Sequence, residues 1–201
     1  MLIHAIIPAS RANGPDLRAV VFFQGCTLGC PGCWNPTSHP FSGREMTAKD
    51  VASDVMRARA DHRIEGVTFS GGEPMQQATA LQALVWILRS QAPEMSFGMF
   101  SGYTESELTE GRYCIWGQSL SPIHKRHLWE EIQAQLDFAV LGRFNRLQPI
   151  SAPLRTSRNQ VLRLFSSRYV PSDFSEQSIE VTIHDGGRAE VTGFPTLGVP
   201  C

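Results

Sequence analysis

The chain has 201 residues, of which 42% are hydrophobic and 18% are charged, and its formal net charge is -1. This composition is typical of a globular protein with a buried core, and the small net charge disfavours partners that bind by charge alone. We therefore expect no nucleic-acid partner and no membrane partner. The short apolar run at the N-terminus stops at Pro8, so we also expect no targeting segment and a cytoplasmic location.

Strand-like and helix-like segments alternate through the first half of the chain. Four runs rich in β-branched or apolar side chains are predicted strands, over residues 1–8, 18–24, 65–70 and 95–100. One helix is predicted after Thr47, an N-cap for which Asp50 completes a weak capping box. A second helix is predicted over residues 75–91, because its apolar residues fall on one helical face.

The second half of the chain is more polar and its elements are shorter. We expect a helix start over residues 104–110, an inserted loop over 111–123, a helix over 124–135 and strands over 137–142 and 159–165. Residues 143–158 contain Pro149 and Pro153 and are predicted to form a long surface loop.

The last part of the chain differs from the rest in character. Residues 178–184 and 188–193 alternate in strand fashion around Asp185-Gly186-Gly187, and Asp-Gly between alternating runs predicts a β-hairpin. We therefore expect a core over residues 1–168 and a C-terminal β-hairpin extension over 169–201.

The order of strands and helices predicts an α/β fold with parallel strands and helical crossovers. A complete eight-stranded barrel takes about 250 residues, so we expect an incomplete barrel or an open curved sheet. Binding sites in such folds gather at the carboxyl ends of the strands, where this chain carries its cysteine-rich and glycine-rich loops.

Three of the five cysteines follow the second predicted strand. Cys26, Cys30 and Cys33 have the spacing C-x3-C-x2-C, and glycines between them permit a tight loop. Three thiolates can hold three corners of a [4Fe–4S] cluster and leave one iron open to a ligand. We therefore predict an iron–sulfur site here.

Two other interpretations of these cysteines stay open at this point. A structural zinc site needs a fourth ligand, which His39 or Cys114 could supply, but the spacing fits paired zinc knuckles poorly. Three inert buried cysteines are the other alternative. We expect Cys114 itself to pack as a small core residue, and Cys201 to be a mobile terminal residue.

The cysteine spacing, followed directly by Trp34, resembles the signature of the radical S-adenosylmethionine (SAM) superfamily. Gly71-Gly72-Glu73-Pro74 follows the next strand and resembles that superfamily's GGEP motif. The resemblance implies a (β/α)6-type partial barrel, a [4Fe–4S] cluster on the three cysteines, and S-adenosyl-L-methionine on the open iron. It also implies reductive cleavage of SAM to a 5'-deoxyadenosyl radical, which abstracts a hydrogen atom from the substrate.

The same resemblance suggests which residues contact the cofactor. They are predicted at the strand ends and in the cysteine loop: Gly32, Trp34, Gly71, Gly72, Glu73 and Ser101. For Trp34 the alternative is an ordinary core aromatic, and for Glu73 a role only in ordering its own loop.

Further segments are similar to the activating proteins of glycyl radical enzymes, and most of all to the small activase of anaerobic ribonucleotide reductase. These segments are Asn13-Gly14-Pro15, Trp34-Asn35-Pro36, Ser101-Gly102-Tyr103, Leu141-Gly142-Arg143-Phe144 and Ser157-Arg158-Asn159-Gln160. The implied partners are a glycyl radical enzyme and a flavodoxin or ferredoxin-like electron donor. Residues 111–130 and 170–201 depart from that family, so the substrate identity stays open.

Two alternatives to the activase therefore remain at this stage. One is a radical SAM enzyme that modifies a peptide or a small metabolite. The other is a structural metal-binding module without catalytic activity. Binding of about four irons per chain, together with SAM cleavage, would separate an enzyme from such a module.

Overall fold

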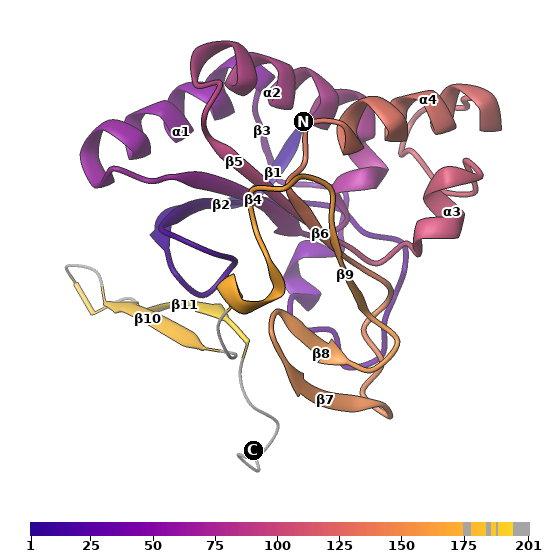
Figure 1. The fold of residues 1–201 in the computed structure, drawn as a ribbon. Helices are drawn as coiled ribbons and strands as arrows, with labels where there is room; N and C mark the ends of the chain where they lie inside the picture. The colour runs from indigo at the N-terminus through magenta and orange to yellow at the C-terminus, as the bar shows by residue number, and fades with distance from the viewer. Residues whose placement is uncertain (175–177, 184–185, 188, 195–201) are drawn as a thin grey trace.

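A computed structural model describes residues 1–174, 178–183, 186–187 and 189–194 (Figure 1). Within these residues the centre is a seven-stranded sheet with strand order β3-β1-β2-β4-β5-β6-β9. Its strands are β1 (Leu2–Ser10), β2 (Arg18–Phe23), β3 (Arg44–Glu45), β4 (Gly66–Gly71), β5 (Ser96–Ser101), β6 (Phe138–Leu141) and β9 (Val161–Leu164). Two small hairpins lie outside this sheet: β7 (Pro149–Ala152) with β8 (Arg155–Ser157), and β10 (Ile179–Ile183) with β11 (Ala189–Gly193).

The helices lie on one face of the sheet (Figure 1). They are α1 (Ala48–His62), α2 (Ala78–Gln91), α3 (Glu105–Thr109) and α4 (Pro122–Gln133). Short 3-10 turns occupy Pro36–Ser38, Pro74–Gln77 and Pro171–Asp173. The predicted capping box of α1 is confirmed, since Thr47 accepts from the backbone N–H of Asp50 and the Asp50 carboxylate accepts from that of Thr47. None of these helices, in the part of the chain that the structure describes, has the length and apolarity that a membrane span requires.

Helical crossovers make the middle of the sheet parallel. Strands β2, β4, β5 and β6 are parallel neighbours, which confirms the mixed α/β prediction. The outer strands β1 and β9 are antiparallel to β2 and β6, respectively. The physical reason is connection length and content: residues 11–17 are too few for a crossover, and residues 142–160 contain no helix.

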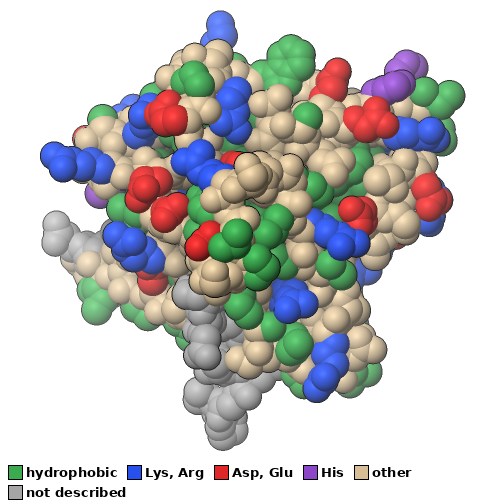
Figure 2. Space-filling model, viewed as in Figure 1, with side chains coloured by type: hydrophobic (Ala, Val, Ile, Leu, Met, Phe, Trp, Pro, Cys, Tyr) green, Lys and Arg blue, Asp and Glu red, His purple; other side chains and the backbone are tan. Residues whose placement is uncertain are grey.

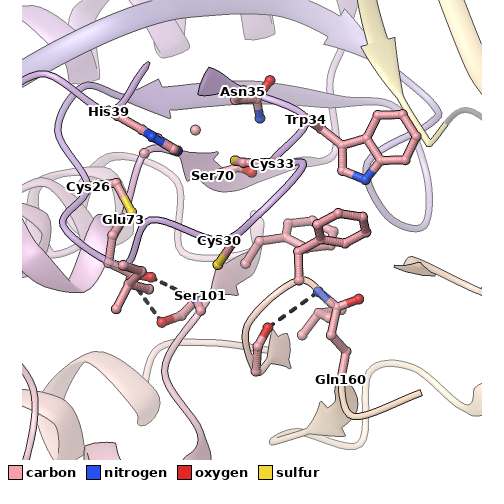
Figure 3. Close-up of a pocket in the computed structure, with 18 residues that line it drawn as sticks. Cys26, Cys30, Cys33, Trp34, Asn35, His39, Ser70, Glu73, Ser101 and Gln160 are labelled. Atoms are coloured by element: carbon pink, nitrogen blue, oxygen red, sulfur yellow. Dashed lines mark hydrogen bonds between the residues drawn. The ribbon is translucent and has the colours of Figure 1, made fainter. Parts of the chain in front are cut away.

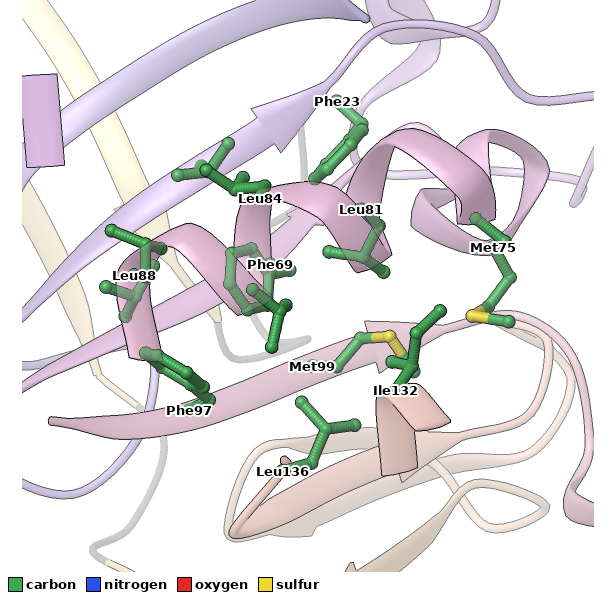
Figure 4. Close-up of a cluster of buried hydrophobic side chains, with 14 of the residues drawn as sticks. Phe23, Phe69, Met75, Leu81, Leu84, Leu88, Phe97, Met99, Ile132 and Leu136 are labelled. Carbon is green, nitrogen blue, oxygen red and sulfur yellow. The ribbon is translucent and has the colours of Figure 1, made fainter. Parts of the chain in front are cut away.

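The main hydrophobic core fills the space between the sheet and the helices (Figure 4). Alternate residues of the parallel strands point into it, among them Phe23, Phe69 and Phe97, all of them fully buried. The predicted apolar face of α2 supplies Leu81, Leu84 and Leu88. Burying each of these leucine side chains stabilises the folded state by about 2 kcal/mol, so this layer holds α2 on the sheet.

Among the described residues, the other face of the sheet carries no α-helix. A smaller cluster covers its lower part, where Phe138 packs edge-on against Tyr169 and Phe174. Beneath it Arg18 is fully buried and donates hydrogen bonds to Thr68 Oγ1 and Ser96 Oγ at 2.8 Å each. The carboxyl ends of the parallel strands stay open on this face, and they are the place where loops can form a site.

Two predictions about the second half have different outcomes. Residues 143–158 are not an unstructured surface loop, because β7 and β8 pair there as an antiparallel hairpin with Leu154 in the left-handed region at its turn. The prolines that suggested a loop lie at the start of β7 and in that turn. The predicted C-terminal hairpin is confirmed by the pairing of β10 with β11, although Asp185 lies outside the described residues.

Candidate functional site

The cysteine loop leaves the carboxyl end of β2 and is held in place by the returning chain. The backbone N–H of Gly25 donates to Ser38 O at 2.7 Å, and that of Cys26 donates to His39 O at 2.9 Å. Cys26, Cys30 and Cys33 are half-buried free thiols. All three line one cavity of about 140 Å³ at the open end of the sheet (Figure 3).

The glycine loop after β4 lies directly against the cysteine loop. The backbone N–H of Gly72 donates to Phe23 O at 2.7 Å, and that of Glu73 donates to Gly25 O at 2.9 Å. A Cβ atom on Gly72 would lie 2.4 Å from Gly25 O, closer than two such atoms can approach. Glycine is therefore required at position 72 for the two loops to meet.

Glu73 connects the glycine loop to the next strand end. Its carboxylate accepts hydrogen bonds from Ser101 Oγ at 2.8 Å, from the backbone N–H of Gly102 at 2.7 Å and from that of Met75 at 2.9 Å. The side chain is 1% exposed, and this burial raises the pKa of Glu73 to about 7 despite the three donors. Glu73 thus orders the loops after β4 and β5, and its contact with SAM stays a prediction.

Burial makes the thiols of the cysteine loop harder to ionise. Burial raises the pKa of Cys26 to about 11 and also raises that of Cys30, and Glu73 adds to both effects. Without a metal these groups are therefore neutral thiols near pH 7. Because metal ligation requires the thiolate, a metal group bound here must displace these protons.

The alternative for these thiols is the ligand set of a single metal ion. Among the described residues, no three histidine, cysteine, aspartate or glutamate side chains are close enough together to hold one metal ion. In a [4Fe–4S] cluster each thiolate binds a different iron, so its cysteines stand farther apart than the ligands of one zinc ion. The assignment of a cluster to these three cysteines rests on their C-x3-C-x2-C spacing.

Most of the other predicted contact residues line the same cavity. Trp34, Gly71, Gly72, Glu73 and Ser101 do so, whereas Gly32 does not. A Cβ atom on Gly32 would lie 3.3 Å from Arg146 Cδ.

The structure also tests the predictions for Trp34 and Cys114. Trp34 is 41% exposed and tilts against Phe144 with ring centroids 5.8 Å apart, so it is not an ordinary core aromatic. Cys114 is exposed, which overturns the expectation that it packs in the core, because its loop runs over the surface. Cys201 lies outside the described residues.

Several residues of the cavity were not predicted as contacts. They lie in the cysteine loop and at the ends of the strands: Leu28, Asn35, His39, Ser70, Phe100, Gly102, Val140, Gly142, Phe144 and Gln160. Most of them could have been found from their place in the sequence, directly after a predicted strand. Residues at the carboxyl ends of parallel neighbouring strands meet at one edge of a sheet. Gln160 comes instead from the connection before β9, and its signal was the similarity of residues 157–160 to the activases.

A family model described as a 4Fe-4S single cluster domain matches residues 12–163. This stretch includes the three cysteines, the glycine loop and the whole parallel part of the sheet. The C-terminal hairpin lies outside it.

The chain is also similar to named proteins. It is 28% identical over 173 residues to the anaerobic ribonucleoside-triphosphate reductase-activating protein of Vibrio cholerae, which covers 83% of this chain and 99% of that protein. The protein of the same name from Escherichia coli K12 is 30% identical over 112 residues, 54% of this chain and 73% of its own length. The pyruvate formate-lyase-activating enzyme of Clostridium pasteurianum is 39% identical over 92 residues, 44% of this chain and 39% of its own length.

Proposed function

The chain belongs to the 4Fe-4S single cluster domain family and to the radical SAM activating enzymes, and we propose that it generates a glycyl radical on a partner protein. Its cofactors are a [4Fe–4S] cluster and S-adenosylmethionine. The partner that we propose is a glycyl radical enzyme related to anaerobic ribonucleotide reductase, by analogy with the named relatives. The open sheet would then be the partial barrel of this superfamily, in a reducing, cytoplasmic setting.

The residues of the cavity fall into three roles in this proposal. Cys26, Cys30 and Cys33 hold three irons of the cluster. Gly71 and Gly72 present backbone groups to SAM, and Trp34 lies beside its adenine. What the bound cofactors supply is one-electron chemistry, an electron from the cluster and a hydrogen-abstracting radical from SAM.

The chain itself orients the cofactors and excludes water. Glu73 fixes the glycine loop through its bonds to Ser101 and Gly102. Phe100, Val140 and Phe144 form an apolar wall of the cavity. No acid–base pair of the protein is needed, because removal of a hydrogen atom transfers the proton and the electron together.

The observation that carries the proposal is the backbone contact between the cysteine loop and the glycine loop around one cavity. The test is anaerobic reconstitution with iron and sulfide, followed by incubation with SAM, a reductant and a glycyl radical enzyme encoded nearby. We expect about four irons per chain, release of 5'-deoxyadenosine and a glycyl doublet in the EPR spectrum. A modified peptide or metabolite in place of the doublet would select the other enzymatic function, and iron binding without SAM cleavage would select a structural module.

An excess of arginine in the last third of the described chain supports an acidic electron donor. Residues 138–172 contain six arginines and no aspartate or glutamate, although the whole chain has 18 basic and 19 acidic residues. Figure 2 shows Lys and Arg side chains over the part of the molecule that holds β7 and β8. We place a flavodoxin or ferredoxin-like donor on this face.

The ion pairs of these arginines indicate where on the surface the electron donor binds. Arg143 and Arg163 are neutralised by Glu107 and Glu105, respectively. In the described part of the chain, Arg146 and Arg158 form no ion pair. Arg146 lies against Gly32 of the cysteine loop, so a negatively charged carrier bound to it would approach the cluster closely.

A further inference from the structure

A groove runs between the C-terminal hairpin and the open face of the sheet. It encloses about 250 Å³ and is lined by side chains from β2, β4, β5, β11 and the cysteine loop. Four of its lining residues, Trp34, Asn35, Ser70 and Phe100, also line the cysteine cavity. The groove and the cysteine cavity therefore adjoin, and a ligand in one can reach the other.

The hairpin is fixed to the core by specific contacts. Asn13 Nδ2 donates to Thr192 Oγ1 at 2.9 Å, and both side chains are buried. Phe194 packs against Phe100 with ring centroids 5.5 Å apart. The backbone N–H of Arg11 donates to Glu180 at 2.8 Å. Strand β11 therefore forms a fixed wall of the groove, and this wall lies beyond the residues that match the family model.

The lining has a chemistry of its own. None of the side chains that line the groove carries a charge, and Phe22, Phe100 and Phe194 make it largely aromatic. Asn13 is 4% exposed, yet within the described residues its Oδ1 accepts no hydrogen bond, and the Asn35 carboxamide has no hydrogen-bond partner there either. The free Oδ1 of Asn13 suits a peptide N–H group, and the Asn35 carboxamide suits peptide N–H and C=O groups, with small uncharged side chains packed between the rings.

We propose that this groove binds an extended, uncharged peptide segment of the substrate protein and leads its glycine into the cysteine cavity. The inference rests on the proposed function, since it names the part of the partner that the site receives. It assigns selection of the substrate to the C-terminal hairpin, with Val191 and Phe194 as specificity-determining residues.

The test measures binding to the full chain by calorimetry, with and without the reconstituted cluster. The probes are capped nine-residue peptides of serine, alanine and valine around a central glycine, and analogues with aspartate or lysine beside the glycine. We expect the uncharged peptide to bind at least about tenfold more tightly than either analogue. Phe194→Ala should weaken its binding about tenfold, the loss typical of a buried aromatic anchor.

A change of specificity keeps the test independent of folding. Val191→Asp should lose the uncharged peptide and gain affinity for the lysine analogue, because an opposite charge then faces it. Ile183→Asp, at an exposed position of the same hairpin outside the groove, should bind as the wild type does. Equal binding of the three peptides, or unchanged preference in Val191→Asp, would overturn the assignment.

Two further outcomes separate this inference from the proposed function. Ile183→Asp, which lies outside both the groove and the cysteine cavity, should release 5'-deoxyadenosine from SAM at the wild-type rate when no substrate is present. If the wild type cleaves SAM but does not discriminate among the peptides, only the groove assignment is wrong, and failure to cleave SAM would overturn the proposed function itself. A variant that ends at Phe194 is compared with the full chain. If only this shortened variant binds the peptide, the chain's own last residues occupy the groove, and the assignment is overturned.

Discussion

Glu73 accepts a hydrogen bond from Ser101 Oγ at 2.8 Å, and this bond joins the loop after β4 to the end of β5. The two residues are 1% and 5% exposed, respectively. Ionising Glu73 in this buried environment costs desolvation energy, and its three hydrogen-bond donors do not fully offset that cost. The pKa of Glu73 is therefore raised to about 7. The geometry of the cofactor pocket is therefore linked to the protonation of one side chain.

The first prediction concerns stability against pH in the cluster-free protein. A carboxyl whose pKa rises from 4.5 to about 7 on folding stabilises the folded state fully below pH 4.5, and the stabilisation is lost as the pH rises to 7. The unfolding free energy should fall by about 2 to 3 kcal/mol between pH 5 and pH 8 from this group alone. Urea denaturation of Glu73→Gln should lack that part of the pH dependence. Glu45→Gln, at an exposed position, should keep it.

The second prediction concerns the close approach of the two loops. Gly72→Ala places a Cβ atom 2.4 Å from Gly25 O, so the loops must separate. We expect a loss of about 1 to 3 kcal/mol in unfolding free energy and reduced iron loading. The control is Gly29→Ala, which has a positive φ of 59° but open space around it and should cost only about 1 kcal/mol. Equal iron content in the two variants would show that the loops tolerate separation.

The third prediction concerns the cluster ligands. Serine at Cys26, Cys30 or Cys33 removes one thiolate, and each variant should hold far less than the roughly four irons per chain of the wild type. Iron and sulfide analysis after anaerobic reconstitution, together with visible absorption, measures this. Cys114→Ser removes an exposed thiol that does not line the cavity and should load normally. Iron loss in that variant would point to a fourth protein ligand.

The fourth prediction concerns the electron donor. Replacing Arg146 and Arg158 together by glutamate reverses two charges that form no ion pair in the described part of the chain, and Arg146 lies beside the cysteine loop. Reduction of the cluster by reduced flavodoxin should slow by about tenfold at low ionic strength, with a smaller effect at high salt. Reduction by dithionite, a small reductant that needs no docking surface, should be unchanged. Lys49→Glu on α1 is the control, and a similar slowing there would indicate a general charge effect.

The sequence by itself was sufficient wherever the determining interactions are local. The capping box of Thr47 and Asp50 lies within four residues, and the apolar face of α2 follows from helical periodicity alone. The C-x3-C-x2-C spacing similarly predicted an iron–sulfur site in the cysteine loop before any contact was known. The order of strands and helices predicted parallel central strands, because a helix between two strands returns the chain to the same edge.

Only the tertiary structure decided which of these local features act together. Gly72 meets Gly25, and Glu73 meets Ser101, across many intervening residues, so no pattern in either segment shows why glycine or glutamate is needed there. The position of the C-terminal hairpin on the core likewise depends on the hydrogen bond between Asn13 and Thr192, which lie near opposite ends of the chain. The sequence determined the chemistry that the cysteine loop can carry, and the packing of distant segments decided the shape of the space in which it acts.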